Sequence, residues 1–407
     1  MGLPIEGVAM MKKSALATSS LAVAALLATG LSPALAENAM TAAAFTADQG
    51  VAAPDPLARF VPAADRTDHT IDYRHWDEAL AWFVIPMGPP LRITPPPKAE
   101  PRLGTRITYG HTSRFRLEGN RIAFSMLTDE VRAALTEYRQ DLERVGTELD
   151  LARLPRNEQL AYWLNLHNVA VIEALAHEYP LRTPAEGRFG TNDESLQDAT
   201  LVTVKGVALS PRDIRERIVY PNWRDPKVIY GFWRGEIGGP SIQRLAYSGA
   251  NVDTLLDFGA EEFANSLRGV DAWGGRLRVS RIYDEAKPFY FADEDVLRDH
   301  LRQYAREDVQ ELIEKNARVS YTIYDEDIAD LMFGKGDPDL NVLCTVDETS
   351  IGAACTLAGA IPDAAAMRLM EERAQKLYRA WKRGIRTGMV IFGDGTDGEY
   401  GEPKEVR

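Results

Sequence analysis

Cysteine is scarce in this sequence of 407 residues, and its long apolar runs end early. The two cysteines, Cys344 and Cys355, stand too far apart for a zinc-finger pair, so that class of site is excluded. Beyond residue 36, no stretch reaches the roughly 18 consecutive apolar residues of a transmembrane helix. We therefore expect a soluble protein without an integral membrane segment after that point.

An excess of positive charge is also missing. The chain has 47 lysines and arginines against 60 aspartates and glutamates, a net charge of −13. An acidic surface repels polyphosphates and anionic lipids, and no basic stripe interleaved with aromatic residues runs through the chain. The charge balance therefore argues against a nucleic-acid partner and favours a role of the charges in solubility.

The sequence lacks the short motifs that identify common enzyme classes. It contains no His-Glu-x-x-His, Gly-x-Ser-x-Gly, phosphate-binding loop, dinucleotide fingerprint or calcium loop. Glu173 and His177 are the closest helical pair of potential metal ligands, and an exposed ion pair explains their spacing more simply. No metal and no cofactor are expected.

The N-terminus has the form of a cleavable secretory signal. Lys12 and Lys13 precede an apolar run at 15–31, and Ala34-Leu35-Ala36 has the small residues that a signal peptidase requires. A retained anchor is the weaker alternative, because polar residues interrupt the run and no charged stop-transfer cluster follows. The signal predicts a periplasmic or secreted protein.

Export favours a disulfide bond between Cys344 and Cys355, which enclose a short, turn-like segment. Closing a loop of about ten residues would contribute on the order of 2 to 3 kcal/mol to stability. The alternative is a reactive thiol, but no histidine or lysine stands nearby in the sequence to lower its pKa.

Composition and periodicity divide the chain into successive regions. These are a signal peptide (1–36), a flexible segment (37–57), a helix and hairpin region (58–126), a core domain (127–335), a disulfide loop and helix (336–392) and an acidic disordered tail (393–407).

Within these regions the patterns predict particular elements. Helices are expected at 73–85, 128–145, 157–178, 241–247, 252–267, 293–306 and 363–382, and strands at 201–204, 207–209, 228–230 and 276–279. Alternation at 104–124 predicts a hairpin turning near Gly119, whose polar residues from His111 to Asn120 would face water. The expected fold is α+β: a central apolar helix and flanking helices on a small mixed sheet, with a C-terminal extension.

The helix at 157–178 carries apolar residues around nearly its whole circumference, so it should be buried. Asn165 and Asn168 then need buried hydrogen-bond partners, either in a ligand or, as we favour, in the backbone of neighbouring loops. His167 faces about 200° away from Asn165 and is either a core histidine, which we favour, or an acid/base group. Trp76, Trp82 and Trp163 are expected in the core rather than on a stacking platform.

A glycine-rich loop at 231–240 contains two further candidate residues, Arg234 and Glu236. Its backbone is suited to approach a ligand closely or to bind an anion at the start of the following helix. A tight turn that packs against the core is the simpler interpretation.

The segment Ala161-Tyr162-Trp163-Leu164-Asn165-Leu166-His167-Asn168-Val169 resembles the hallmark helix of the bacterial domain of unknown function 547 family. The resemblance extends over about 127–290, including 206–210 and 224–228. It implies a mixed helical and β domain, often exported, without an established reaction. Many members carry a cysteine pair where this chain has residues 233–240, so a thiol nucleophile or second disulfide there does not apply to this protein.

These observations lead to two functional hypotheses. The first is a non-catalytic envelope binding or scaffold protein, which binds a small molecule, a glycan or an envelope protein in a cleft between 157–178 and 231–240. Asn165, His167, Asn168, Arg234 and Glu236 are its binding candidates. The alternative is a hydrolase or transferase acting on envelope material, with His167 or Glu236 as general base.

Overall fold

The computed structural model describes residues 55–97, 111–335, 344–345, 354–355 and 364–385. The predicted signal peptide, nearly all of the flexible segment 37–57, most of the disulfide loop and the acidic tail lie outside these residues.

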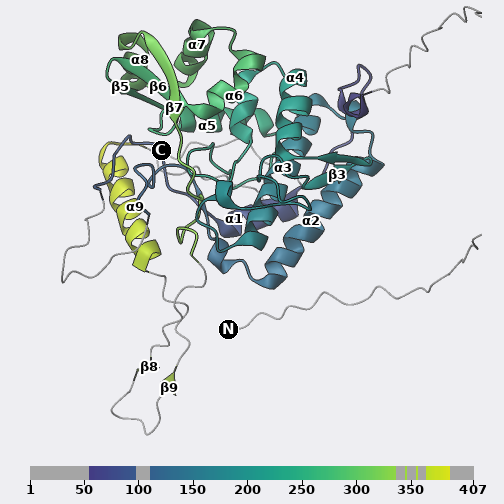
Figure 1. The fold of residues 1–407 in the computed structure, drawn as a ribbon, viewed down its shortest axis with the longest axis horizontal. Coiled ribbons are helices and arrows are strands. Elements are labelled where there is room, and N and C mark those ends of the chain that lie inside the picture. Colours follow the sequence, from purple (N-terminus) through teal and green to yellow (C-terminus); the bar gives the residue numbers. More distant parts are fainter. Residues whose placement is uncertain (1–54, 98–110, 336–343, 346–353, 356–363, 386–407) are drawn as a thin grey trace, which may run out of the picture. The chain divides into compact units, whose positions relative to one another are not determined.

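The described residues form an α+β fold, as predicted (Figure 1). Its α-helices are α1 (Arg74–Phe83), α2 (Asp129–Glu148), α3 (Arg156–Glu178), α4 (Tyr220–Asn222), α5 (Val252–Ala264), α6 (Arg281–Tyr290), α7 (Glu294–Tyr304), α8 (Glu307–Lys315) and α9 (Ala364–Lys382). Shorter helical turns are η1 (Pro56–Phe60), η2 (Phe124–Met126), η3 (Leu151–Arg153), η4 (Pro184–Glu186), η5 (Asp213–Val219) and η6 (Pro226–Gly231). The strands are β1 (Val84–Ile85), β2 (Arg121–Ile122), β3 (Val202–Val204), β4 (Val207–Leu209), β5 (Val270–Trp273), β6 (Arg276–Ser280), β7 (Arg318–Ile323), β8 (Cys344–Thr345) and β9 (Ala354–Cys355). No helix in the described part of the chain is both long and apolar enough to cross a membrane.

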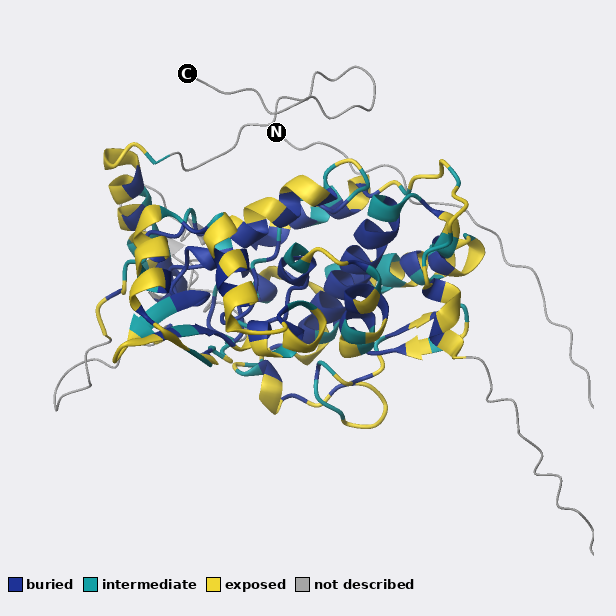
Figure 2. Cartoon of the chain, turned by 90° about the horizontal axis from the view of Figure 1, so that it is seen from above, coloured by how far each residue is buried: buried dark blue, intermediate teal, exposed yellow. Residues whose placement is uncertain are grey.

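The helix α3 is buried along almost its whole length, as its apolar circumference predicted (Figure 2). The neighbouring helix α2 begins where the Thr128 hydroxyl accepts a hydrogen bond from the Val131 N–H. Gly146 of α2 lies against Tyr162 of α3, and a Cβ there would collide with the tyrosine hydroxyl, which donates to the Leu142 carbonyl at 3.0 Å. The absence of a side chain at Gly146 therefore lets the two helices approach closely.

The largest sheet is mixed and has the order β5-β6-β7. Strands β5 and β6 form an antiparallel pair, whereas β7 runs parallel to β6 after the chain has passed through α6, α7 and α8. These helices pack beside the sheet (Figure 1), and Leu277 and Val279 of β6 are fully buried. The sheet and its helices thus extend the hydrophobic core that surrounds α3.

The hairpin predicted at 104–124 is wrong for the residues that the structure describes; 104–110 lie outside them. Strand β2 pairs with β1, whereas the chain at 114–119 forms turns. The expected water-exposed polar face is also wrong, because Glu118 is 2% exposed. Its carboxylate accepts the backbone N–H groups of Leu267 and Arg268 at 2.9 and 3.2 Å. A distant loop has therefore replaced water as the partner of Glu118, whereas the side chain of Arg114 remains 42% exposed.

Two further element predictions are wrong. The segment 228–230 belongs to the helical turn η6, because Pro226 starts the turn and the Asp225 side chain accepts the Lys227 N–H. The segment 241–247 is irregular instead of helical. The side chains of Asp77 and Asn165 accept its N–H groups at Ala246 and Tyr247, at 2.6 and 3.0 Å, and so compete with helical hydrogen bonds.

Of the three tryptophans predicted to lie in the core, one does not. Trp76 and Trp163 are buried, as expected, but Trp82 is 54% exposed. On α1, the residues Trp76, Leu80 and Phe83 share the buried face, and Trp82 lies beside that face rather than on it.

Candidate functional site

The two asparagines of α3 are buried and hydrogen-bonded, and both contact loop backbone. Asn165 donates from Nδ2 to the Tyr247 carbonyl at 2.7 Å and accepts the Tyr247 N–H at 3.0 Å. Asn168 donates to the Gly231 carbonyl and accepts the Trp233 N–H, both at 3.0 Å. Each amide therefore fastens one loop to the central helix, and Asn168 holds the start of the glycine-rich loop.

His167 is fully buried between two hydrogen-bond partners. Its Nδ1 lies 3.0 Å from Asn168 Oδ1, and its Nε2 lies 3.1 Å from Arg215 Nη1. Because a guanidinium only donates, Nε2 accepts, and Nδ1 carries the proton. Burial and then the Arg215 charge lower the pKa of His167 well below its usual value. The imidazole is neutral, and its basic nitrogen is already occupied.

Next to His167, two arginines converge on one glutamate; we call Arg215, Arg234 and Glu285 the arginine cluster. Arg234 forms a bidentate pair with Glu285 at 2.8 and 2.6 Å. Arg215 Nε donates to the same carboxylate at 3.1 Å, and its Nη1 also donates to Gln197 Oε1 at 2.7 Å. The cluster thus joins η5, the glycine-rich loop and α6.

The electrostatics of the cluster keep Glu285 ionised. Burial by itself would favour the protonated carboxyl, but Arg234 and then Arg215 hold the pKa of Glu285 well below its usual value. Burial likewise disfavours the charged form of Arg234, and Glu285 more than offsets it, so the pKa of Arg234 is raised. Two guanidinium charges are therefore shared by one carboxylate.

Several donors of this region remain unused. In the described part of the chain, Arg215 Nη2, Arg234 Nε and the Tyr220 hydroxyl are buried and have no hydrogen-bond partner. Burial first, and then the charge of Glu285, raise the pKa of Tyr220, with Arg234 and Arg215 also in electrostatic range. The side chain of Glu285 is 21% exposed, so the cluster is partly open to solvent at this residue.

Glu236 is the second acidic group in this region. The Tyr324 hydroxyl donates to Glu236 Oε2 at 2.5 Å. Burial raises the pKa of Glu236 to about 7, although Tyr324 and Arg234 act in the opposite direction. Glu236, two residues along the loop from Arg234, therefore has a pKa much closer to neutral pH than an exposed glutamate has.

The structure brings His167, Asn168, Arg234 and Glu236 into one region and places Asn165 on a separate loop contact. Sequence reasoning missed Arg215, Tyr220 and Glu285. The only sequence signal concerned Arg215, which stands between the apolar residues Ile214 and Ile218, both of which are buried. Its partner stands 70 residues away in the chain.

The predicted exposed ion pair between Glu173 and His177 is wrong. Glu173 is 8% exposed and pairs with Arg139 of α2, whereas His177 Nε2 contacts the Thr136 hydroxyl at 3.1 Å. Each of the two side chains therefore has its own partner on α2, Arg139 for Glu173 and Thr136 for His177, and they do not pair with each other. Across the residues that the structure describes, no group of three or more His, Cys, Asp or Glu side chains is placed to hold a metal ion.

Comparison with known proteins identifies a family for part of the chain. Residues 151–264 match the model of the family described as protein of unknown function, DUF547, which confirms the resemblance seen at 161–169. The match contains α3, the glycine-rich loop and Arg215, but not Glu285. The chain is also 24% identical over 178 residues to the glycine–tRNA ligase alpha subunit of Petrotoga mobilis. That similarity covers 35% of this chain and 62% of the ligase subunit, less than two thirds of its length. No solved structure matches the chain.

Proposed function

We propose that this chain is a non-catalytic protein of the cell envelope that binds a small molecule through an anionic group, a carboxylate or a phosphate, at the arginine cluster. The observation that carries the proposal is the set of unused donors at Arg215, Arg234 and Tyr220. A buried donor without a partner costs about 1 to 3 kcal/mol, so a cluster of them in a folded protein calls for a partner.

The charges of the cluster favour an anion as that partner. Two guanidinium groups face one ionised carboxylate, and His167 is neutral, so the cluster itself carries a surplus positive charge, which Glu236 offsets in part when it is ionised. Guanidinium groups match carboxylate and phosphate oxygens in geometry, and their hydrogen bonds to anions are among the stronger ones in proteins. An oxygen anion would accept the unused hydrogens and balance the charge.

The positions of the other candidates support binding rather than catalysis. Both ring nitrogens of His167 already take part in hydrogen bonds within the protein, so neither is available to a substrate. Asn165 and Asn168 are occupied by loop backbone. These residues build the site, whereas Arg215 and Arg234 supply donors to a ligand.

We infer the envelope location from the signal-like N-terminus, and a disulfide between Cys344 and Cys355 would agree with it. In the backbone pairing of β8 with β9, Cys344 stands directly opposite Cys355. Residues in that relation are close enough for a disulfide, which forms in oxidising compartments.

Thermal unfolding with inorganic phosphate or acetate tests the proposal. Saturating anion, at about 100 times its dissociation constant, should raise the melting temperature by about 5 °C. Arg234→Lys keeps the charge but removes the unused Nε–H group, and should abolish most of this rise. The matched control is Arg212→Lys, on an exposed arginine that pairs with Asp198. An equal rise in the Arg234→Lys protein, or none in the wild type, would refute anion binding at the cluster.

Glu236 supports a second candidate function, a hydrolase or transferase of envelope material that uses this carboxyl as general base. Its pKa of about 7 lies where a general base is most effective. Turnover of isolated cell-wall fragments that disappears in Glu236→Gln, in a variant that is at least as stable as the wild type, would favour this function. Turnover that survives the substitution would exclude Glu236 as the base.

A further inference from the structure

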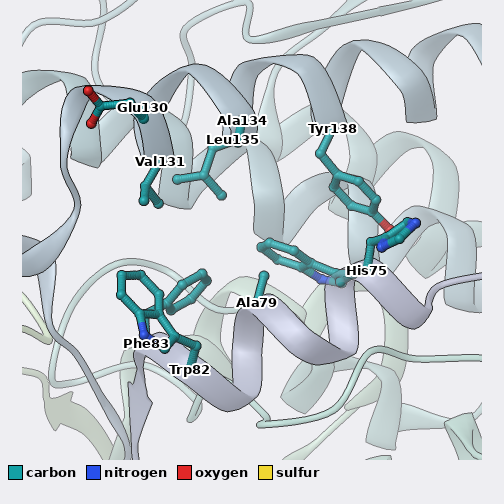
Figure 3. Close-up of a pocket in the computed structure, with 10 residues that line it drawn as sticks. His75, Ala79, Trp82, Phe83, Glu130, Val131, Ala134, Leu135 and Tyr138 are labelled. Atoms are coloured by element: carbon teal, nitrogen blue, oxygen red, sulfur yellow. The ribbon is translucent and has the colours of Figure 1, made fainter. Parts of the chain in front are cut away.

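A groove of about 430 Å³ lies between α1 and α2, far in sequence from the arginine cluster. Figure 3 shows Trp82 and Phe83 of α1 across an open space from Val131 and Leu135 of α2, with Glu130 toward one end and His75 toward the other. We call this space the α1–α2 groove.

The groove has an aromatic floor and one aromatic wall. Trp76 is 2% exposed and stacks on Tyr138, with ring centroids 5.3 Å apart and planes 17° apart. Phe83 meets the same indole edge-on at 5.9 Å. Trp82, by contrast, is 54% exposed, so core packing does not explain its position. Flat rings around an open space of this size are typical of sites for aromatic ligands.

The groove is acidic at one end. Glu130 is an exposed carboxylate among the lining residues, and no lysine or arginine is among the described residues that line the space. Burial first, and then the carboxylates of Asp77, Asp72 and Asp141, raise the pKa of Tyr138. Asp72 is paired with Arg74 and Asp141 with Arg144, so the argument for negative charge in the groove rests on Glu130. The nearby Arg132 is paired with Asp129. A positively charged ligand would therefore complement this end of the groove.

We propose that the α1–α2 groove binds an amphiphilic cation, a small molecule with a flat aromatic body and a protonated amine. The aromatic body stacks against Trp82 and contacts the apolar side chains that line the groove, and the amine lies at the Glu130 end. The volume falls in the range of small-molecule sites, roughly 300 to 1,000 Å³. An α-helix, with a diameter of about 10 to 12 Å including side chains, would not fit inside it. This site is independent of anion binding at the arginine cluster.

Two fluorescent probes that share one aromatic body and differ in charge test the proposal. Dansylcadaverine carries a protonated amine, and dansylglycine carries a carboxylate. Each is titrated into the full chain while the dansyl group is excited directly, so that loss of a tryptophan does not itself alter the signal. We expect saturable binding of dansylcadaverine and weaker binding of dansylglycine by about tenfold, because the acidic end of the groove repels the anion.

Substitutions with matched controls locate the site. Trp82→Ala should weaken dansylcadaverine binding about tenfold, the usual scale for removing an aromatic anchor. Trp273→Ala removes another exposed indole, 78% exposed at the β5–β6 turn, and should leave binding unchanged. Glu130→Gln should reduce the preference for the cationic probe by about fivefold, whereas Glu137→Gln on the same helix should not.

Circular dichroism establishes that each variant is folded before titration. Equal affinity of the wild type for the two probes would overturn the cationic assignment. Unchanged binding in Trp82→Ala, or no saturable binding of dansylcadaverine, would overturn the site itself. Arg234→Lys should bind dansylcadaverine as the wild type does. The dansylcadaverine titration therefore tests the groove alone, and the phosphate or acetate titration tests the arginine cluster alone.

Discussion

Replacing Asn168 by alanine separates a role in holding the loop from a role in contacting a ligand. The amide bridges the Gly231 carbonyl and the Trp233 N–H, and it also lies beside His167 Nδ1. Alanine leaves all these groups buried, and nothing else in the described surroundings accepts the Trp233 N–H. We therefore expect a large loss of stability even without any ligand.

The magnitude follows from the two backbone groups. An unpaired buried polar group costs about 1 to 3 kcal/mol, so losing partners for one carbonyl and one N–H predicts a destabilisation of about 4 kcal/mol. Asn157→Ala is the matched control on the same helix, because among the described residues the Asn157 side chain bonds only that of Asp253, at the protein surface. Its effect should stay below about 1 kcal/mol.

Urea unfolding followed by circular dichroism measures both changes without ligand. The midpoint of Asn168→Ala should fall strongly while the slope of the transition stays constant. A loss of less than about 1 kcal/mol in Asn168→Ala would refute the loop-holding role, since two buried backbone groups cannot lose their partners so cheaply.

Two further predictions concern Glu236 and α9. Because the pKa of Glu236 is raised from 4.5 to about 7 in the folded protein, its contribution to stability is present below pH 4.5 and is lost as the pH rises through about 7. Urea titrations should show the wild type losing up to about 3 kcal/mol relative to Glu236→Gln over this range, and parallel pH profiles would contradict the raised pKa. Lys376 of α9 is 3% exposed and donates to the carbonyls of Met87, Gly88 and Leu117. Lys376→Met should make 364–385 about tenfold more susceptible to limited proteolysis, and an unchanged cleavage rate would show that this lysine does not hold the helix.

Elements whose determinants lie within one or two turns were predictable from the sequence. Helix α7 begins one residue after Asp293, whose side chain accepts the N–H groups of Asp295 and Val296. Helix α2 begins in the same way at Thr128, and α3 shows the burial that its apolar circumference predicted. Caps and periodicity need no knowledge of the rest of the fold.

Elements that depend on distant partners were not predictable. The segment 241–247 has helix-forming residues, but Asp77 and Asn165 accept its N–H groups from 169 and 82 residues away. Strand β2 was expected to pair within a hairpin and instead pairs with β1. In each case a non-local hydrogen bond replaced the local one on which the prediction rested.

Part of the candidate site was likewise predictable from the sequence, and part was not. The burial of Asn165, His167 and Asn168 followed from the helix on which they stand. The arginine cluster was not predictable from the sequence, because Arg215 and Glu285 belong to separate segments and no local sequence pattern links them. Trp82 was misplaced because the periodicity of a ten-residue helix defines its buried face only coarsely.

The glycine-rich loop connects the structural and the proposed binding roles. It is held by Asn168 at its start, by Glu285 through Arg234, and by a backbone bond from the Ile237 N–H to the Asp327 carbonyl at 2.8 Å. A loop fixed in this way presents Arg234 without further ordering, so a ligand would lose little free energy to rearrangement. It follows that substitutions of Asn168 should reduce both stability and anion affinity, whereas Arg234→Lys should reduce mainly affinity. If the two variants instead changed both quantities in the same proportion, the cluster would be a structural ion-pair network, and its unused donors would require another explanation.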